Sequence, residues 1–148
     1  MLKNLNYYQD KTIAIIPARG GSTRIKNKNL KKIDNQSLIK KSIMTCKNSG
    51  VFDEIIVSTD SLDIADVSRN TSSILHERSK FNSSSTASTE SVISEVMIDF
   101  PELLRDKTLI YLIQCTCPFL EEKDLIDSFD LIKAKKIDYN CIISGYFF

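Results

Sequence analysis

The sequence of 148 residues has little net charge, a single histidine and no long apolar run. Its formal net charge of +1 argues against a general binder of nucleic acids or of membrane surfaces. Histidine occurs once, and the four cysteines include no C-x-x-C pair, so a zinc site would need ligands scattered along the chain. We therefore expect free, mostly buried thiols in a reducing cytosol.

The first apolar run, residues 13–16, is too short for the core of a signal peptide or for a membrane span. Apolar residues make up 42% of the chain and charged residues 26%, which is ordinary for a folded domain. We found no internal repeat and no domain boundary. The sequence predicts one cytoplasmic domain over residues 1–148, with neither a membrane nor a nucleic acid as its partner.

Short apolar runs alternate with segments that have apolar residues at helical spacing. Strands are predicted over residues 12–16, 54–59, 72–75, 108–114 and 139–144. Helices are predicted over residues 37–48, from 60 or 61 to 70, 90–100 and around 125–132. This alternation predicts an α/β fold with a mainly parallel sheet and helices on both faces. In such sheets ligands bind beyond the carboxyl ends of the strands.

Two segments stand outside this alternation. Residues 77–88 are polar and rich in serine, and we interpret them as a functional loop because regular elements enclose them. Phe147 and Phe148 follow the last predicted strand without a capping helix or a polar tail. We expect from this that the chain is the front part of a longer fold.

The strongest motif is the basic loop that follows the first predicted strand, residues 17–29. Six basic residues and no acidic residue occur between Arg19 and Lys32. Backbone N–H groups at Gly20 and Gly21, together with Arg and Lys side chains, could cradle a polyphosphate. The loop fits neither GxxxxGK[ST] nor GxGxxG, and it contains no aromatic residue to stack on bases. From composition alone, a solvated basic loop explains it equally well.

Four motifs in order along the chain resemble the CMP-sialic acid synthetase (acylneuraminate cytidylyltransferase) family. They are IAIIPARGGSTRIKNKN from residue 13, FDEIIVSTD from residue 52, Arg78 with TAST at 86–89, and QCTCP from residue 114. The resemblance implies a Rossmann-like nucleotide-diphospho-sugar transferase fold. It also implies an enzyme that transfers CMP from CTP to an acidic nine-carbon sugar and releases pyrophosphate.

The resemblance also implies roles for individual residues. Arg19 and Lys28 would be catalytic, with Arg19 on the CTP phosphates and Lys28 near the reacting α-phosphate. Gln114 and Thr116 would face the sugar. The full set implied to bind the nucleotide is Ala18, Arg19, Gly20, Gly21, Ser22, Arg24, Lys28, Asn29, Arg78, Ala87, Ser88 and Thr89.

Several residues depart from the family pattern and leave the sugar open. Thr23 stands where a lysine is usual, and Ser85 stands where an aspartate is usual. Cys115 and Cys117 replace the proline and the second serine of Q-P-T-S-P. A pseudaminic or legionaminic acid is therefore as compatible with the sequence as N-acetylneuraminate.

The resemblance further implies Mg²⁺ as the cofactor, with its aspartate ligands expected beyond Phe148, and a homodimer of the complete protein. Two other functions stay open from the sequence. The chain could be a non-catalytic remnant that at most binds a nucleotide, or a nucleotidyltransferase for another acidic sugar.

Overall fold

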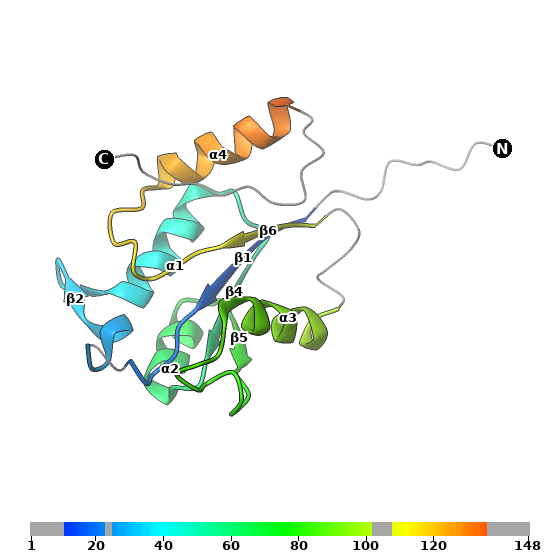
Figure 1. Cartoon of the computed structure of the whole chain (residues 1–148). Coiled ribbons are helices and arrows are strands. Elements are labelled where there is room, and N and C mark those ends of the chain that lie inside the picture. The colour runs from blue at the N-terminus through cyan, green and yellow to red at the C-terminus, as the bar shows by residue number, and fades with distance from the viewer. Residues whose placement is uncertain (1–10, 23–24, 102–107, 136–148) are drawn as a thin grey trace.

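A computed structural model describes residues 11–22, 25–101 and 108–135. Its centre is a four-stranded parallel sheet in the order β5-β4-β1-β6 (Figure 1). The strands are β1 (Thr12–Pro17), β4 (Glu54–Thr59), β5 (Ile74–Glu77) and β6 (Leu109–Leu112). Since all four run in the same direction, the loops after β1, β4, β5 and β6 open at one edge of the sheet.

The central strand β1 is buried on both faces. Ala14 and Ile16 pack into one cluster with Ile39 and Ile43, whereas Ile13 and Ile15 pack into a second cluster with Val96. All four β1 side chains are fully buried. A continuous apolar run rich in β-branched residues is typical of a strand covered on both faces, and this explains why β1 was recognisable from sequence.

Helices cover both faces, as the sequence predicts. One face carries α1 (Leu38–Ser49), α2 (Leu62–Asn70) and α4 (Glu122–Lys135), and the other carries α3 (Thr89–Asp99) (Figure 1). Both ends of α1 carry residues that commonly cap a helix. The Ser37 side chain accepts a hydrogen bond from the Lys40 N–H, and Gly50 ends the helix at φ 66°.

Two predicted strand boundaries are wrong. The third strand is Ile74–Glu77 and not 72–75, because Thr71 ends α2 and Ser72 turns the chain at φ 53°. β6 is shorter than the predicted 108–114. Ser61, one of the two starting positions that the sequence offered for the second helix, occupies the cap position of α2, and Asp60 instead accepts a hydrogen bond from the Gly20 N–H. The strand predicted over 139–144 lies outside the described residues.

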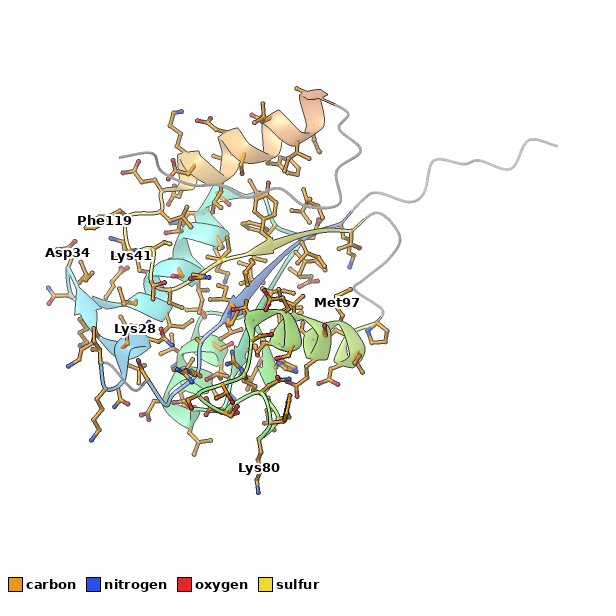
Figure 2. All side chains as sticks on the ribbon, in the orientation of Figure 1. Lys28, Asp34, Lys41, Lys80, Met97 and Phe119 are labelled. Atoms are coloured by element: carbon orange, nitrogen blue, oxygen red, sulfur yellow. The ribbon has the colours of Figure 1, made fainter. Side chains whose placement is uncertain are left out.

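A short hairpin follows the basic loop and was not predicted. The 3₁₀ turn η1 (Lys28–Leu30) leads into β2 (Lys32–Ile33) and β3 (Gln36–Ser37). Asp34 and Asn35 both have positive φ, which is the backbone conformation of a tight two-residue hairpin turn. Figure 2 shows Asp34 at the outer tip of the hairpin and Lys28 on η1, and both η1 and β3 contact α1.

Candidate active site

A pocket of about 280 Å³ lies at the carboxyl edge of the sheet. It collects residues from the loops after β1, β5 and β6 and from the start of α3. Ten residues that the sequence predicted for the site line it: Arg19, Ser22, Lys28, Asn29, Arg78, Ala87, Ser88, Thr89, Gln114 and Thr116. The structure therefore brings together residues nearly one hundred positions apart in the chain. Among the other predicted site residues, Ala18, Gly20 and Gly21 flank the pocket, and Arg24 lies outside the described residues.

The pocket lining is positively charged. Arg19, Lys28 and Arg78 line it, and none of its described lining residues is a carboxylate. Burial lowers the pKa of Arg78; Asp60 and Glu95 act against this shift, and the Arg19 charge adds to it. Two guanidinium groups that repel each other in this way would gain from a shared anionic ligand.

The backbone of the basic loop differs from the predicted phosphate cradle. The Ala18 N–H donates to the Ser58 carbonyl at 2.8 Å, and the Ser22 N–H donates to the Gly20 carbonyl at 3.0 Å. The Gly20 N–H donates to Asp60 Oδ1 at 2.8 Å. These three N–H groups are engaged within the protein, so the positive character of the pocket comes mainly from side chains.

Gly20 has a packing reason to be glycine. A Cβ atom at this position would lie 2.8 Å from Ser61 Cβ, which is closer than real Cβ contacts allow. The loop after β1 therefore rests directly on the start of α2. A Cβ at Gly21 would meet nothing within 4 Å.

Asn29 stabilises the loop that carries Arg19. Its side chain is 7% exposed, and its amide donates to the Arg19 carbonyl at 3.0 Å. Arg19 in turn donates from Nη1 to the Ser84 carbonyl at 3.1 Å. Arg19 thus bridges the basic loop and the serine-rich loop before α3, and both loops line the same pocket.

The N-terminus of α3 also faces the pocket. Ser88 is the N-cap, as the sequence allowed, and its hydroxyl accepts a hydrogen bond from the Ser91 N–H. Ser88 and Thr89 line the pocket, so the positive end of the helix dipole adds to the three cations.

The loop after β6 supplies the neutral side of the pocket. Gln114, Cys115 and Thr116 line it, and the Thr116 hydroxyl donates to Gln114 Oε1 at 3.3 Å. Cys115 is buried, and burial raises its pKa to about 11, although Ser42 and Lys28 act against this shift. This thiol is therefore uncharged at physiological pH and forms part of the pocket wall.

Sequence reasoning missed the residues that support the site. Asp60, which holds Gly20, was interpreted as a helix cap, and Asn82 was only one member of a loop called functional as a whole. Asn82 lines the pocket and donates to Glu95 Oε2 at 2.6 Å. The position of these polar residues after β4 and β5 was the available signal, because both strands end at the carboxyl edge.

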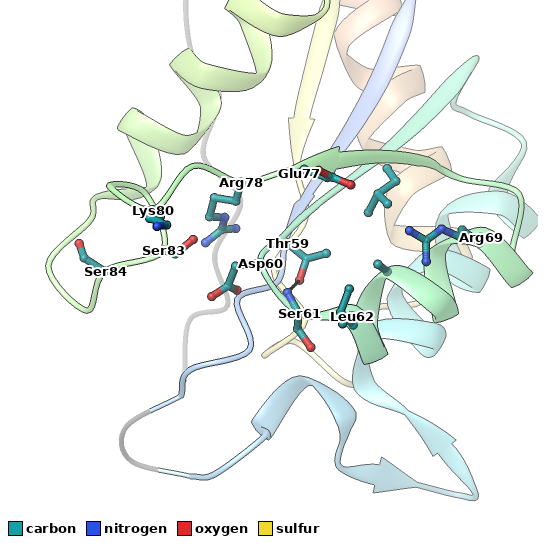
Figure 3. Close-up of a pocket in the computed structure, with 12 residues that line it drawn as sticks. Thr59, Asp60, Ser61, Leu62, Arg69, Glu77, Arg78, Lys80, Ser83 and Ser84 are labelled. Atoms are coloured by element: carbon teal, nitrogen blue, oxygen red, sulfur yellow. Dashed lines mark hydrogen bonds between the residues drawn. The ribbon is translucent and has the colours of Figure 1, made fainter.

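A second hollow of about 510 Å³ lies between α2 and the β5 side of the sheet. Figure 3 shows Asp60 and Glu77 in its lining together with Arg69, Arg78 and Lys80. Only Arg78 among the residues predicted for the site reaches it. Its mixed charge suits a polyphosphate less well than the all-cationic lining of the smaller pocket.

The metal implied by the sequence resemblance does not fit this lining by itself. Mg²⁺ prefers carboxylate and phosphate oxygens, and the smaller pocket has no carboxylate among its described lining residues. Within the described part of the chain, His, Cys, Asp and Glu side chains form no group of three that could hold a metal ion.

Comparison with known proteins agrees with this geometry. The family model described as cytidylyltransferase matches residues 13–144, which is most of the chain. The chain belongs to the cytidylyltransferase family. Within the described segments, none of the helices is both long and apolar enough to cross a membrane.

Two curated relatives in the family show what this chain resembles. The pseudaminic acid cytidylyltransferase of Campylobacter jejuni is 36% identical over 121 residues, which cover 78% of this chain and 50% of the relative. N-acylneuraminate cytidylyltransferase A of Danio rerio is 35% identical over 125 residues, which cover 84% of this chain and 28% of the relative. The chain thus spans half or less of the length of these two relatives.

A solved structure confirms the predicted fold. The structure of a CMP:2-keto-3-deoxy-manno-octonic acid synthetase superposes with a TM-score of 0.69 at 19% sequence identity. The match covers 86% of this chain and 49% of that one. The fold is therefore the Rossmann-like nucleotidyltransferase fold.

Proposed function

We propose that this chain is the CTP-binding part of an enzyme that transfers CMP from CTP to a sialic-acid-like nonulosonic acid. The observation that carries the proposal is the lining of the pocket, in which Arg19, Lys28 and Arg78 stand without a carboxylate among the described residues. A triphosphate is the ligand whose charge this lining complements best.

To catalyse this reaction the protein must position the two substrates and stabilise the negative charge that develops on the phosphoryl oxygens. The sugar's anomeric hydroxyl oxygen forms a bond to the α-phosphorus as the bond from that phosphorus to the bridging oxygen breaks. The hydroxyl proton is released, and pyrophosphate leaves with the electron pair. Negative charge develops on the phosphoryl oxygens, so fixed cations accelerate the step. Lys28 is assigned to the α-phosphate, while Arg19 and Ser22 are assigned to the outer phosphates.

The other residues of the pocket lining are assigned to the remaining groups of the substrates. Asn29, Arg78, Ala87, Ser88 and Thr89 would surround the cytosine and ribose. Gln114 and Thr116 would face the sugar. The names of the relatives favour a pseudaminic or N-acylneuraminic acid, and a legionaminic acid has the same chemical class.

The remaining properties of the whole protein are proposals of the same kind. We infer a requirement for Mg²⁺, with ligands supplied by residues other than the described pocket lining. We also infer a homodimeric, cytoplasmic enzyme without a nucleic-acid partner, acting in the synthesis of surface polysaccharides.

Nucleotide selectivity tests the proposal directly. Calorimetric titration of the chain with CTP, UTP, ATP and GTP should give the tightest binding with CTP, because the pocket pairs polar groups with a pyrimidine base. Release of pyrophosphate should then follow when CTP is supplied together with pseudaminic, legionaminic or N-acetylneuraminic acid. Equal affinity for a purine triphosphate would refute the assignment.

Nucleotide binding without transfer is the second candidate. The missing carboxylate in the described lining favours it, because phosphoryl transfer normally needs a metal ion beside the phosphates. The two functions separate in one experiment. CTP binding with no pyrophosphate release at saturating sugar and Mg²⁺ identifies a binding module, whereas turnover identifies the transferase.

A further inference from the structure

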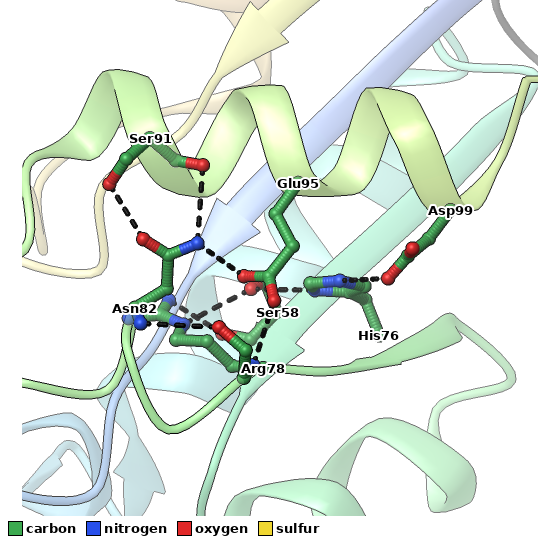
Figure 4. Close-up of polar contacts among 8 residues, drawn as sticks. Ser58, His76, Arg78, Asn82, Ser91, Glu95 and Asp99 are labelled. Carbon is green, nitrogen blue, oxygen red and sulfur yellow. Dashed lines mark hydrogen bonds and ion pairs between the residues drawn. The ribbon is translucent and has the colours of Figure 1, made fainter.

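Four polar side chains form a continuous chain of hydrogen bonds behind the pocket (Figure 4). Asp99 Oδ2 lies 3.0 Å from His76 Nε2, and His76 Nδ1 lies 2.9 Å from Ser58 Oγ. Arg78 donates from Nε to Ser58 Oγ at 3.2 Å and from Nη2 to the Ser58 carbonyl at 2.9 Å. The chain therefore connects the end of α3 to a pocket residue.

The partner of each His76 ring nitrogen indicates which nitrogen carries the proton. A guanidinium can only donate, and an ionised carboxylate can only accept. His76 therefore carries its proton on Nε2 toward Asp99, and its bare Nδ1 accepts the Ser58 hydroxyl proton. That leaves a lone pair of Ser58 Oγ for Arg78. The opposite neutral tautomer would place a bare Nε2 lone pair 3.0 Å from the ionised Asp99 carboxylate, which cannot donate.

We propose that His76 and Asp99 are positioning residues that hold Arg78 in its binding orientation through Ser58. The inference rests on the proposed function for what Arg78 contacts. Asp99 selects the histidine tautomer, the tautomer orients the Ser58 hydroxyl, and Ser58 fixes the guanidinium at two points.

The location of Asp99 supports a role beyond helix stability. Asp99 is the last residue of α3, where a negative charge opposes the helix dipole. Its side chain is 49% exposed, so it contributes little to the core, whereas His76 is 2% exposed. His76 is also the direct partner of Ser58 in the register of β4 and β5. The position of the buried imidazole is thus fixed by the pairing of β4 and β5. The Asp99 carboxylate accepts the hydrogen bond from His76 Nε2.

Asp99→Asn is the test, because the amide keeps the shape but can donate as well as accept. The chain contains a single histidine, so imidazole ¹⁵N NMR reports the His76 tautomer without ambiguity. Wild-type protein should show the Nε2–H form. The variant should populate the other tautomer and bind CTP about three- to tenfold more weakly, with an unchanged Tm.

Two further variants sharpen the result. Asp130→Asn changes an exposed aspartate of α4 on the opposite face of the sheet and should behave as wild type. Asp99→Glu keeps the carboxylate and should restore both the tautomer and most of the CTP affinity. The proposal is overturned if Asp99→Asn leaves tautomer and affinity unchanged, or if Asp99→Glu loses as much as Asp99→Asn.

A nucleotide-free measurement separates this inference from the proposed function. Solvent exchange of the Arg78 Nε proton should be slow in the wild type and faster in Asp99→Asn. If the wild type binds no CTP, the proposed function fails. The His76 tautomer and the exchange rate of the Arg78 Nε proton still test whether Asp99 and His76 position Arg78. Equal exchange rates in the two proteins would refute it.

Discussion

Lys26 and Lys28 stand two positions apart in the basic loop, but only Lys28 lines the pocket. Lys26 is exposed, whereas Lys28 is half-buried on η1. The structure therefore distinguishes Lys28, whose charge faces the pocket, from Lys26, whose charge faces solvent. Sequence composition alone could not make this distinction.

Lys28→Ala should lower kcat for CMP-sugar formation about a hundredfold, because about 3 kcal/mol of charge stabilisation is lost at the reacting phosphate. Arg19→Ala should in addition raise the KM for CTP, since it contributes to ground-state binding. Steady-state kinetics on the transferase measures both parameters.

Lys26→Ala is the matched control for these variants and should leave the kinetics near wild type. All three substitutions should change the free energy of unfolding by about 0.5 kcal/mol or less, because the side chains do not support the core. Near wild-type turnover in Lys28→Ala would mean that the basic loop is only a solvated surface.

The described cysteines should differ sharply in reactivity. Burial raises the pKa of Cys46 to about 12 and that of Cys115 to about 11, whereas Cys117 is exposed. Thiolate is the reacting species, so iodoacetamide at pH 7.5 should modify Cys117 well before the other two. Peptide mass spectrometry over time checks this order. Modification of Cys115 at the rate of Cys117 would contradict the buried wall described for the pocket.

At the scale of elements, the parallel strands and their helices were predictable because burial on both faces leaves a strong apolar signal. β1 and β4 consist of buried β-branched runs, and α1 has both of its end signals. β5 was misplaced because half of it is polar, with His76 and Glu77 closing the strand. The hairpin of β2 and β3 was invisible because it has only four strand residues and no apolar alternation.

The residues of the candidate site also fall into a predictable group and a group that the sequence did not predict. Residues that touch the pocket follow strand ends and carry motif signals, so most were predictable. The supporting contacts of Asp60, Glu95 and Asp99 join segments far apart in the chain, and no local pattern encodes them.

The packing of the basic loop on α2 predicts a difference between neighbouring glycines. Gly20→Ala places a Cβ 2.8 Å from Ser61 Cβ, so the loop or the start of α2 must shift. We expect a loss of about 1–3 kcal/mol in the free energy of unfolding together with weaker CTP binding. Gly21→Ala, whose Cβ would meet nothing within 4 Å, should be close to neutral. Urea denaturation of both variants measures the difference, and equal stabilities would contradict this packing.

The contact of α3 with the serine-rich loop predicts a dependence of stability on pH. Burial acts to raise the pKa of Glu95, but hydrogen bonds from Ser79 and Asn82 leave it below its usual value. A lowered pKa in the folded state adds stability at neutral pH, which is lost as pH falls below about 4.3.

Glu95→Gln should therefore reduce stability at pH 7 by about 1 kcal/mol and flatten the acid side of the stability curve. Thermal unfolding between pH 3 and pH 7 tests this expectation. A variant whose curve parallels the wild type at every pH would show that Glu95 does not hold the loop.

At the scale of the whole molecule, nucleotide affinity should depend on the phosphates and on salt. The chain has a net charge of only +1, so on the proposed function its attraction for CTP should come from the local cations of the pocket. At a concentration of about 100 times Kd, CTP should stabilise the chain by about 2.7 kcal/mol. Raising the ionic strength should weaken CTP binding and leave cytidine binding almost unchanged. Thermal shifts with both ligands at low and high salt check the expectation.

The strand order β5-β4-β1-β6 makes the chain change direction at β1. After β1 it moves outward through β4 to β5, and it then crosses back to β6 on the other side of β1. The loop after β1 leads to α1 on one face of the sheet, whereas the loop after β5 leads to α3 on the other face, and the pocket opens between them beside the loop after β6. If the proposed function holds, substitutions in these loops should change the preferred acidic sugar while the strands stay unaltered. Relatives with different sugar substrates should accordingly differ most at the positions that correspond to Gln114–Pro118, and least along β1.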